Sequence, residues 1–456
     1  MRSLKSLNDA QTFYLETLGC PKNLVDSEKI AYLFKSQGYK KAESPDSADI
    51  ITVNTCGFIL QAKEESIDTI LNLAEYKKSG RCKLLIVTGC LVELYEEELR
   101  QNLPEVDHFF NLHSISNLSR VLSAQSGTKM NKISPAIDRM LLTPPHYAYL
   151  RISDGCNNHC SYCLIPRIRG GLRSRPIPEL VQEAKTLARQ GVKELILIAQ
   201  DIGNYGQDLY GRSCLQKLLA ELDKISSLHW IRLLYLNPQH ISEALLSQIA
   251  ESDKICHYLD IPIQHINDEI LRRMNRKISR KEILQKLDLV RKMLPDASIR
   301  TSIIVGFPGE TKSQFEELLN FIQSQKFQKL GCFLYSQEEG TPAASFYPQV
   351  PEKEKKAHYN RLMGIQQDIS HTFLSKFIGK KITVIVDRKI GVKTFECRTE
   401  FDAPEVDGVV YLEAENVDEG QLHEVEIIDS LEYDLIGRLT TSKGKKYLSE
   451  KEKSIR

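Results

Sequence analysis

Apolar runs and amphipathic stretches alternate along the first 120 residues of the chain. Three apolar runs of strand length are each followed by a neighbouring glycine and cysteine, and then by residues with helical spacing. This repeated strand–helix order favours a parallel sheet covered by helices. The expected strands are Thr12–Leu18, Asp49–Val53 and Lys83–Thr88, and the expected helices begin near Asp26, after Gly57 and after Cys90.

The alternation restarts at Tyr147, beyond a segment rich in Ser, Gly, Lys and Pro that is typical of a linker. Six strand–helix units follow over about 190 residues. A complete barrel of this kind has eight units and about 250 residues, so a partial (βα)6 barrel is predicted. The expected strands are Tyr147–Ile152, Glu194–Ala199, Trp230–Leu236, Tyr258–Ile263, Ser298–Val305 and Leu330–Leu334, and the helices include Pro178–Arg189, Ile241–Ala250, Arg280–Met293 and Lys312–Gln325.

The pattern changes again near the C-terminus. One charged helix is expected at Pro351–Phe377, followed by Val and Ile alternation at Ile382–Val386 that indicates a small all-β unit. The predicted fold class is therefore α/β, with an N-terminal parallel α/β domain, a partial barrel and a small C-terminal all-β domain. The expected bounds are 1–122 for the first domain, 123–146 for a linker, 147–376 for the barrel with its connecting helix, 377–440 for the β domain and 441–456 for a disordered basic tail.

The composition indicates the cellular compartment of the protein, and it shows that charge is unevenly distributed along the chain. Mean hydropathy is −0.31, and neither an apolar run of about 18 residues nor an apolar N-terminal segment is present. We therefore expect a cytoplasmic protein without a membrane partner. The net charge of +1 conceals a β domain with 7 Lys and Arg against 15 Asp and Glu, a net of −8. This acidic unit is either an ordinary solvated surface or a surface that repels nucleic acid and favours a basic partner.

Eleven cysteines are unusual for a cytosolic chain of 456 residues and indicate metal binding or catalysis. Cys156, Cys160 and Cys163 have the spacing CxxxCxxC directly after the first barrel strand. Active sites of such barrels lie at the carboxyl ends of the strands. Three thiolates on one short loop can hold three corners of an iron–sulfur cluster and leave one iron open. A zinc site with His159 as the fourth ligand is the alternative.

Cys20, Cys56 and Cys90 each follow a predicted strand of the N-terminal sheet and each neighbours a glycine. Loops at the carboxyl ends of parallel strands gather at one sheet edge, so these thiols should converge. Three unrelated core cysteines are the alternative. Five further cysteines show no matching spacing and are expected to pack in the core or at the surface: Cys82, Cys214, Cys256, Cys332 and Cys397.

The first triad, with Tyr162 before its last cysteine, resembles the radical S-adenosylmethionine (SAM) superfamily. Both triads in this order resemble the methylthiotransferase family over nearly the whole chain, with a C-terminal domain of the TRAM type. The resemblance implies two 4Fe-4S clusters, one on each triad, and SAM bound to the open iron of the first. It implies that SAM is both methyl donor and radical source, that the second cluster carries the sulfur, and that the SAM site is lined by Tyr162, Gln200, Asp201, Gln264 and Gly306.

Local strings distinguish two branches of that family. GCPKNLVDSE at residues 19–28 and NTCGFI at residues 54–59 look like the RimO branch, whereas tRNA-modifying relatives usually read GCQMN at the first string. The RimO resemblance implies methylthiolation of an aspartate β-carbon in ribosomal protein uS12. The alternative is a tRNA adenosine methylthiotransferase, which the acidic β domain disfavours. The implied partners are uS12 or the small ribosomal subunit and an electron donor such as flavodoxin or ferredoxin, with no tRNA in the leading interpretation.

Overall fold

The computed structural model describes residues 11–114, 117–126 and 139–440. These residues form two compact units, which divide after Gln366. Residues 127–138 of the expected linker and the whole tail at 441–456 lie outside the described residues. The predicted fold class is confirmed, because two parallel sheets with helices are followed by a small closed β-barrel.

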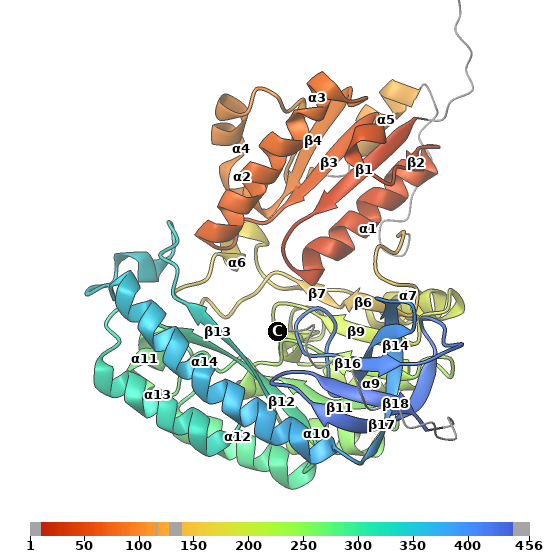
Figure 1. Ribbon diagram of the computed structural model, residues 1–456. Coiled ribbons are helices and arrows are strands. Elements are labelled where there is room, and N and C mark those ends of the chain that lie inside the picture. The colour runs from red at the N-terminus through yellow and green to blue at the C-terminus, as the bar shows by residue number, and fades with distance from the viewer. Residues whose placement is uncertain (1–10, 115–116, 127–138, 441–456) are drawn as a thin grey trace, which may run out of the picture. The chain divides into compact units, whose positions relative to one another are not determined.

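The N-terminal sheet has five parallel strands in the order β2-β1-β3-β4-β5. Helices α1 and α5 pack on one face and α2 and α4 on the other, each over a separate apolar cluster (Figure 1). Strands β2 and β5 were not predicted, because they are too short to show a period. The bounds are β1 Thr12–Thr17, α1 Pro21–Ser36, β2 Lys40–Lys41, β3 Ile50–Thr55, α2 Leu60–Ala74, α3 Tyr76–Ser79, β4 Leu84–Gly89, α4 Cys90–Asn102, β5 His108–Phe110 and α5 Leu118–Ser126.

Helix α1 begins earlier than the predicted start near Asp26. Cys20 is its N-cap and Pro21 its first residue. Proline is favoured at this position because its fixed φ suits a helix and the first N–H groups lack helical partners anyway. The earlier start places Lys22 and Asn23 on the first turn of a helix rather than in a loop.

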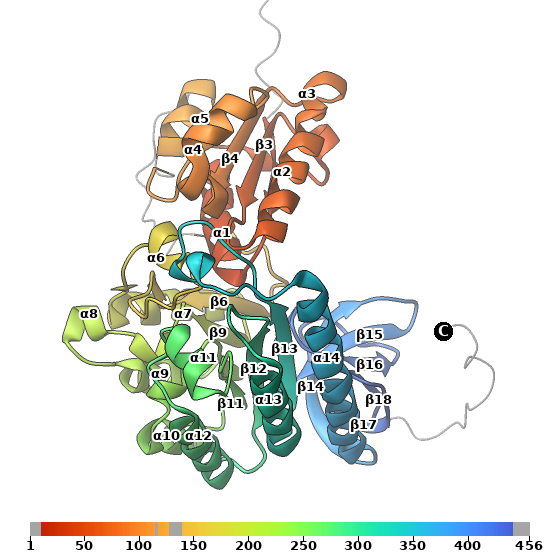
Figure 2. The same cartoon turned by 90° about the vertical axis from the view of Figure 1, so that its left-hand side faces the viewer.

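The second sheet has six parallel strands in the order β13-β12-β11-β10-β9-β6. Helices α9, α10, α12 and α13 run along one side of it (Figure 2). Helices α12 and α13 have the predicted bounds, because each starts with a reciprocal capping box. The bounds are β6 Tyr147–Arg151, α7 Ile177–Arg189, β9 Glu194–Ile198, α9 Leu215–Asp223, β10 Trp230–Leu233, α10 Glu243–Glu251, β11 Ile255–Asp260, α12 Arg280–Met293, β12 Ser298–Val305, α13 Lys312–Gln325 and β13 Lys329–Leu334.

Strand β11 ends at Asp260, before the predicted end at Ile263. Pro262 lacks the N–H that a continued ladder would need. Short elements fill the connections of this unit: β7 Ser153–Asp154, α6 Ile165–Ile168, β8 Arg173–Ser174, α8 Gln207–Tyr210 and α11 Asp268–Arg273.

Helix α14 (Glu352–Leu374) contains the division between the units and precedes a closed barrel of order β14-β15-β16-β18-β17. The barrel core is apolar and includes Cys397, whose pKa burial raises above the usual thiol value. Arg398 is buried and its guanidinium lies 2.6 Å from an oxygen of Asp387. The bounds are β14 Lys381–Lys389, β15 Thr394–Thr399, β16 Val410–Glu413, β17 Leu422–Ser430 and β18 Leu435–Leu439.

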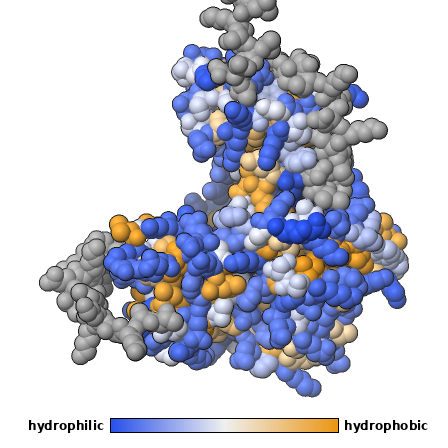
Figure 3. All heavy atoms as spheres, turned by 90° about the vertical axis from the view of Figure 1, so that its right-hand side faces the viewer, coloured by the Kyte–Doolittle hydropathy of each residue, from blue (hydrophilic) through white to orange (hydrophobic). Residues whose placement is uncertain are grey.

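Hydrophilic residues cover most of the face shown in Figure 3, and apolar residues form small separate patches on it. Among the described residues, no helix has the length and apolar character needed to cross a membrane.

A buried ion pair joins two neighbouring strands of the six-stranded sheet. Arg232 on β10 and Glu194 on β9 have fully buried side chains, and Nε lies 2.6 Å from Oε1. Removing one partner leaves the other charge buried and uncompensated, which typically costs about 3–5 kcal/mol. We expect Arg232→Met to lower the free energy of unfolding by about this amount, measured by denaturant unfolding of the full chain. In contrast, Lys224→Met breaks an exposed pair with Glu221 and should leave the free energy of unfolding nearly unchanged. Equal losses in the two variants would show that burial of the Arg232 pair is unimportant.

Candidate active site

The first cysteine triad lies on the loop after β6 and β7. Gly155 precedes it with a φ of +70°, and an added Cβ would stand 2.0 Å from the carbonyl oxygen of Gly171. The Cys156 N–H donates to the carbonyl of Gly170 at 3.1 Å, so the loop folds back tightly on itself. The loop therefore has no room for a side chain at Gly155 and holds its three thiols within a short stretch of chain.

Backbone N–H groups point at two of these thiols. The N–H of Asn158 lies 3.5 Å from Sγ of Cys156, and that of Ile165 lies 3.4 Å from Sγ of Cys163. Burial raises the pKa of Cys163 to about 12, an effect that the Ile165 N–H opposes. A thiol in such a place ionises readily only when a metal replaces its proton, which is the behaviour of a cluster ligand.

The second triad is brought together as its strand positions predict. Cys20, Cys56 and Cys90 follow β1, β3 and β4, which are neighbours in the sheet. A Cβ added at Gly19 would stand 2.9 Å from Sγ of Cys56, so a side chain there would displace the thiol. Cys20 caps α1 and Cys90 opens α4, where the partial positive charge of each helix favours a thiolate.

Asn23 ties the ends of these three strands together. Its Nδ2 donates to the carbonyls of Leu18 and Thr55 at 3.0 and 2.9 Å. Its Oδ1 accepts from the thiol of Cys90 at 3.4 Å. Burial raises the pKa of Cys90 to about 12, and the neighbouring Arg169 counteracts this rise. One buried amide thus fixes the relative positions of the loops that carry the triad.

The chemistry of both donor sets fits iron–sulfur clusters. All six side chains are thiols, glycines allow close approach of the loops, and each triad would leave one iron of a cubane cluster open. In the described part of the chain, no three Cys, His, Asp or Glu side chains converge on a point where one metal ion could be held. Ligands of a cluster stand farther apart than ligands of one zinc ion, because each thiolate binds a different iron.

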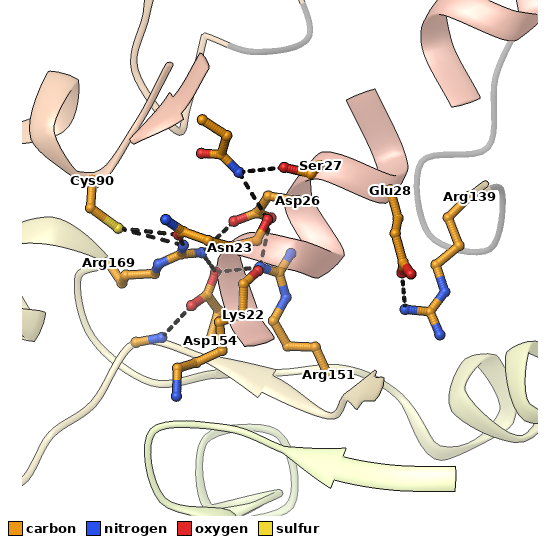
Figure 4. A network of polar contacts seen from close by, with 12 residues as sticks. Lys22, Asn23, Asp26, Ser27, Glu28, Cys90, Arg139, Arg151, Asp154 and Arg169 are labelled. Carbon is orange, nitrogen blue, oxygen red and sulfur yellow. Dashed lines mark hydrogen bonds and ion pairs between the residues drawn. The ribbon is translucent and has the colours of Figure 1, made fainter. Parts of the chain in front are cut away.

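Arg169 joins the two triads through a buried ion network (Figure 4). Its Nη1 lies 2.8 Å from Asp26 on α1 and 3.3 Å from Asp154 on β7. Its Nη2 donates to Asn23 at 2.7 Å and lies 3.7 Å from Sγ of Cys90. Arg151 on β6 pairs with the same two carboxylates at 2.6 and 3.7 Å. The N-terminal sheet is thereby joined to the loop that carries the first triad.

Other residues near this junction belong to further interdomain contacts. Glu338, after β13, accepts from the N–H of Leu60 at 2.7 Å and pairs with Lys63 at 2.6 Å. Arg139 is buried between Glu28 on α1 and Glu183 on α7, at 2.9 and 3.2 Å. Among the described residues, these ion pairs join the N-terminal sheet and its helices to the part of the chain that carries the six-stranded sheet.

Gln200 and Asp201, two of the residues expected to contact SAM, lie just after β9 and support the cluster loop. Asp201 accepts from Asn158 at 2.8 Å, and Gln200 Nε2 donates to Asp154 at 3.4 Å. Both residues thus approach the loop of the first triad from the neighbouring strand. Their contact with SAM stays a prediction.

The other three expected contacts lie nearby. Gln264 and Gly306 follow β11 and β12, with φ of +75° and +72°. Tyr162 packs in an apolar cluster that contains Phe307, and burial together with the Cys160 thiol raises its pKa well above the usual value. These positions at the strand ends are compatible with a SAM site, which also stays a prediction.

Comparison with known proteins identifies the family. Residues 150–322 match the model of the radical SAM superfamily, residues 12–111 the uncharacterized protein family UPF0004, and residues 378–440 the TRAM domain. The ribosomal protein uS12 methylthiotransferase RimO of Clostridioides difficile (strain 630) is 46% identical over 432 residues, covering 93% of this chain and 97% of that protein. The chain belongs to the RimO methylthiotransferase family.

A second RimO, from Anaeromyxobacter sp. (strain K), is 44% identical and covers 94% of this chain and 93% of its own length. Among solved structures, the radical SAM methyltransferase TsrM from Kitasatospora setae superposes with a TM-score of 0.52, at 13% identity, over 74% of this chain and 77% of that one. That likeness shows a shared radical SAM fold. The RimO fold thus supports one 4Fe-4S cluster and SAM in the barrel unit.

The sequence did not identify the residues of the ion network as functional. Arg169 stands among several arginines that follow the first triad, and their spacing alone does not distinguish a basic loop in solvent from a buried ion pair. In the structure Arg169 is 3% exposed and pairs with carboxylates of the protein. Asn23 and Asp26, on the helix that follows Cys20, could have indicated these contacts, because polar residues on a buried helix face need hydrogen-bonding or ionic partners.

Gly155 provides a test of the first cluster site. We expect Gly155→Ala to lose the iron and sulfide of one cluster, because the new Cβ collides with the backbone at Gly171. Gly170 is the matched control, since its φ of +71° is almost the same and an added Cβ meets nothing within 4 Å. Iron and sulfide analysis of both reconstituted variants measures the difference, and equal cluster content would show that close approach at Gly155 is unimportant.

Proposed function

We propose that this chain adds a methylthio group to the β-carbon of an aspartate in ribosomal protein uS12. The observation that carries the proposal is the junction of two thiol triads across one buried ion network, in a chain of the RimO family. Two curated relatives with 46% and 44% identity bear the name of uS12 methylthiotransferase. Their near-complete coverage supports the same activity here.

Each triad would hold one 4Fe-4S cluster, and SAM would bind at the first. When bound, these groups would supply the radical and sulfur chemistry that inserts CH3–S into a C–H bond. The protein's own part is to position and shield them. Asn158 and Asp201 brace the loop of the first triad, Asn23 fixes the loops of the second, and the Cys90 side chain of the second triad is buried.

The acidic TRAM domain supports a protein substrate. Its described residues 378–440 contain 7 Lys and Arg and 15 Asp and Glu. Nucleic-acid affinity depends mainly on neutralising phosphates, so a domain of net charge −8 suits tRNA poorly. A basic ribosomal protein gains favourable electrostatic attraction from the same surface. We further propose a cytoplasmic enzyme that receives electrons from a flavodoxin or ferredoxin.

The substrate is tested by mass spectrometry of uS12. Ribosomes from cells that carry the gene should contain uS12 with the methylthio mass increment on one aspartate, and ribosomes from deletion cells should lack it. Modified tRNA adenosines should be unchanged by the deletion. An unchanged uS12 mass together with altered adenosines would assign the enzyme to tRNA instead.

Substitutions in the two triads should affect different steps of the reaction. We expect Cys160→Ala to abolish SAM cleavage, because it removes a ligand of the cluster that binds SAM. Cys56→Ala should spare SAM cleavage and stop methylthiolation, because it removes a ligand of the sulfur-carrying cluster. Both activities are measured on the same anaerobically reconstituted preparations, with circular dichroism as the check on folding. Equal loss of both activities in a folded Cys56→Ala variant would contradict this division.

A further inference from the structure

Lys22 is a buried cation that lies against a backbone carbonyl and an aromatic ring. The residue is 7% exposed, and its Nζ lies 3.4 Å from the carbonyl oxygen of Ala199. The same nitrogen stands 3.7 Å from the centroid of the Tyr235 ring. Among the described residues, Lys22 forms no ion pair with an Asp or Glu. A carbonyl and an aromatic face compensate an ammonium only in part, and an uncompensated buried charge is costly.

The neighbouring charges leave this ammonium unbalanced. Arg151 and Arg169 both pair with Asp26 and with Asp154, so two cations already share two carboxylates. Lys22 adds a third cation to the same buried region. Figure 4 shows its side chain extending from α1 away from the ion pairs and toward the barrel. Among the arginines, the lysine and the carboxylates of this region, three cations thus stand against two anions.

Lys22 also lies close enough to both thiol triads to act on them electrostatically. It follows Cys20 by two positions on α1 and interacts electrostatically with that thiol. It interacts electrostatically with Cys163 of the first triad as well. Ala199 and Tyr235 follow β9 and β10, at the carboxyl ends of the barrel strands. The excess charge is thus placed where a substrate must lie to be reached from both sites.

The surroundings hold Lys22 in this place. Tyr235 has a φ of +65°, an uncommon conformation for a residue other than glycine. Its N–H donates to Asp260 at 2.9 Å, and its carbonyl accepts from Ile202 at 3.1 Å. This conformation presents the Tyr235 ring to the ammonium. Lys22 is consequently pre-organised rather than free to turn to solvent.

We infer that the Lys22 ammonium binds the side-chain carboxylate of the substrate aspartate and determines the preference for an acidic substrate. The inference rests on the proposed function. An aspartate that enters a buried site must exchange the hydration of its carboxylate for a cation, and Lys22 offers the unbalanced one. The β-carbon is bonded directly to that carboxylate, so a contact to Lys22 orients the C–H bonds that react.

The test compares uS12 with uS12 in which the target aspartate is replaced by asparagine. Wild-type enzyme should modify the aspartate form with the higher kcat/KM. In Lys22→Met, which keeps the length of the side chain without its charge, kcat/KM on the aspartate form should fall on the order of 10- to 100-fold. The preference over asparagine should disappear with it. Lys22→Arg, which restores the charge, should restore the preference.

Lys35→Met is the matched control, because Lys35 is exposed on the same helix. It should match wild type in every measurement. Lys22→Met should keep wild-type iron and sulfide content, cluster EPR spectra, SAM affinity and SAM cleavage without uS12. Weaker binding of labelled uS12 to the loaded Lys22→Met variant gives a readout independent of turnover.

Each contrary outcome has a distinct meaning. If Lys22→Met retains the preference for aspartate, the inference is overturned. If the variant loses activity because it binds SAM more weakly, the inference is also overturned, and Lys22 is assigned to the SAM carboxylate. Altered cluster spectra with an unchanged preference would assign it to the Cys20 thiolate. Failure of the wild-type enzyme to modify uS12 would overturn the proposed function, and the assignment of Lys22 with it.

Discussion

The buried ion network around Arg169 is the interaction on which the site depends. The two thiol triads belong to different sheets, and nothing in either sheet alone brings them together. Arg169 pairs with Asp26 on α1, which packs on the N-terminal sheet, and with Asp154 on β7, beside the loop of the first triad, and it also contacts Cys90 and Asn23. Removing one partner from such a network typically costs about 3–5 kcal/mol, because the remaining charges stay buried without compensation.

The network has an electrostatic consequence for the chemistry. Sulfur ligands and carboxylate substrates are anionic, and burying them requires nearby cations. Arg151 and Arg169 are largely neutralised by Asp26 and Asp154, whereas Lys22 forms no ion pair with a carboxylate of the described residues. The paired arginines join helix α1 to the loop of the first triad, and in our proposal Lys22 binds the carboxylate of the substrate.

Much of the fold could be predicted from the chain because its elements are long and periodic. The predicted bounds of α12 and α13 agree with the structure, since capping residues mark their starts. The cysteines of the second triad could be placed at one sheet edge because parallel strands end on the same side. Strands β2 and β5 escaped prediction, since two or three residues show no alternation.

The partners of the charged residues could not be predicted, because they pair across elements far apart in the chain. Asp26 and Arg169 are separated by more than a hundred residues, and the sequence around each residue does not indicate that the two side chains pair. The start of α1 also mattered, since a helix beginning at Pro21 puts Lys22 and Asn23 on a buried surface. Local pattern revealed which residues could bind clusters, and only the tertiary contacts revealed what joins the two sites.

We propose that the protein holds two clusters close together. Electron paramagnetic resonance of the anaerobically reconstituted full-length protein, with both clusters reduced, measures their interaction. We expect a spectrum broadened and split by magnetic interaction between two 4Fe-4S clusters in one chain. Two independent signals without interaction, or a spectrum and iron content that account for one cluster alone, would contradict it.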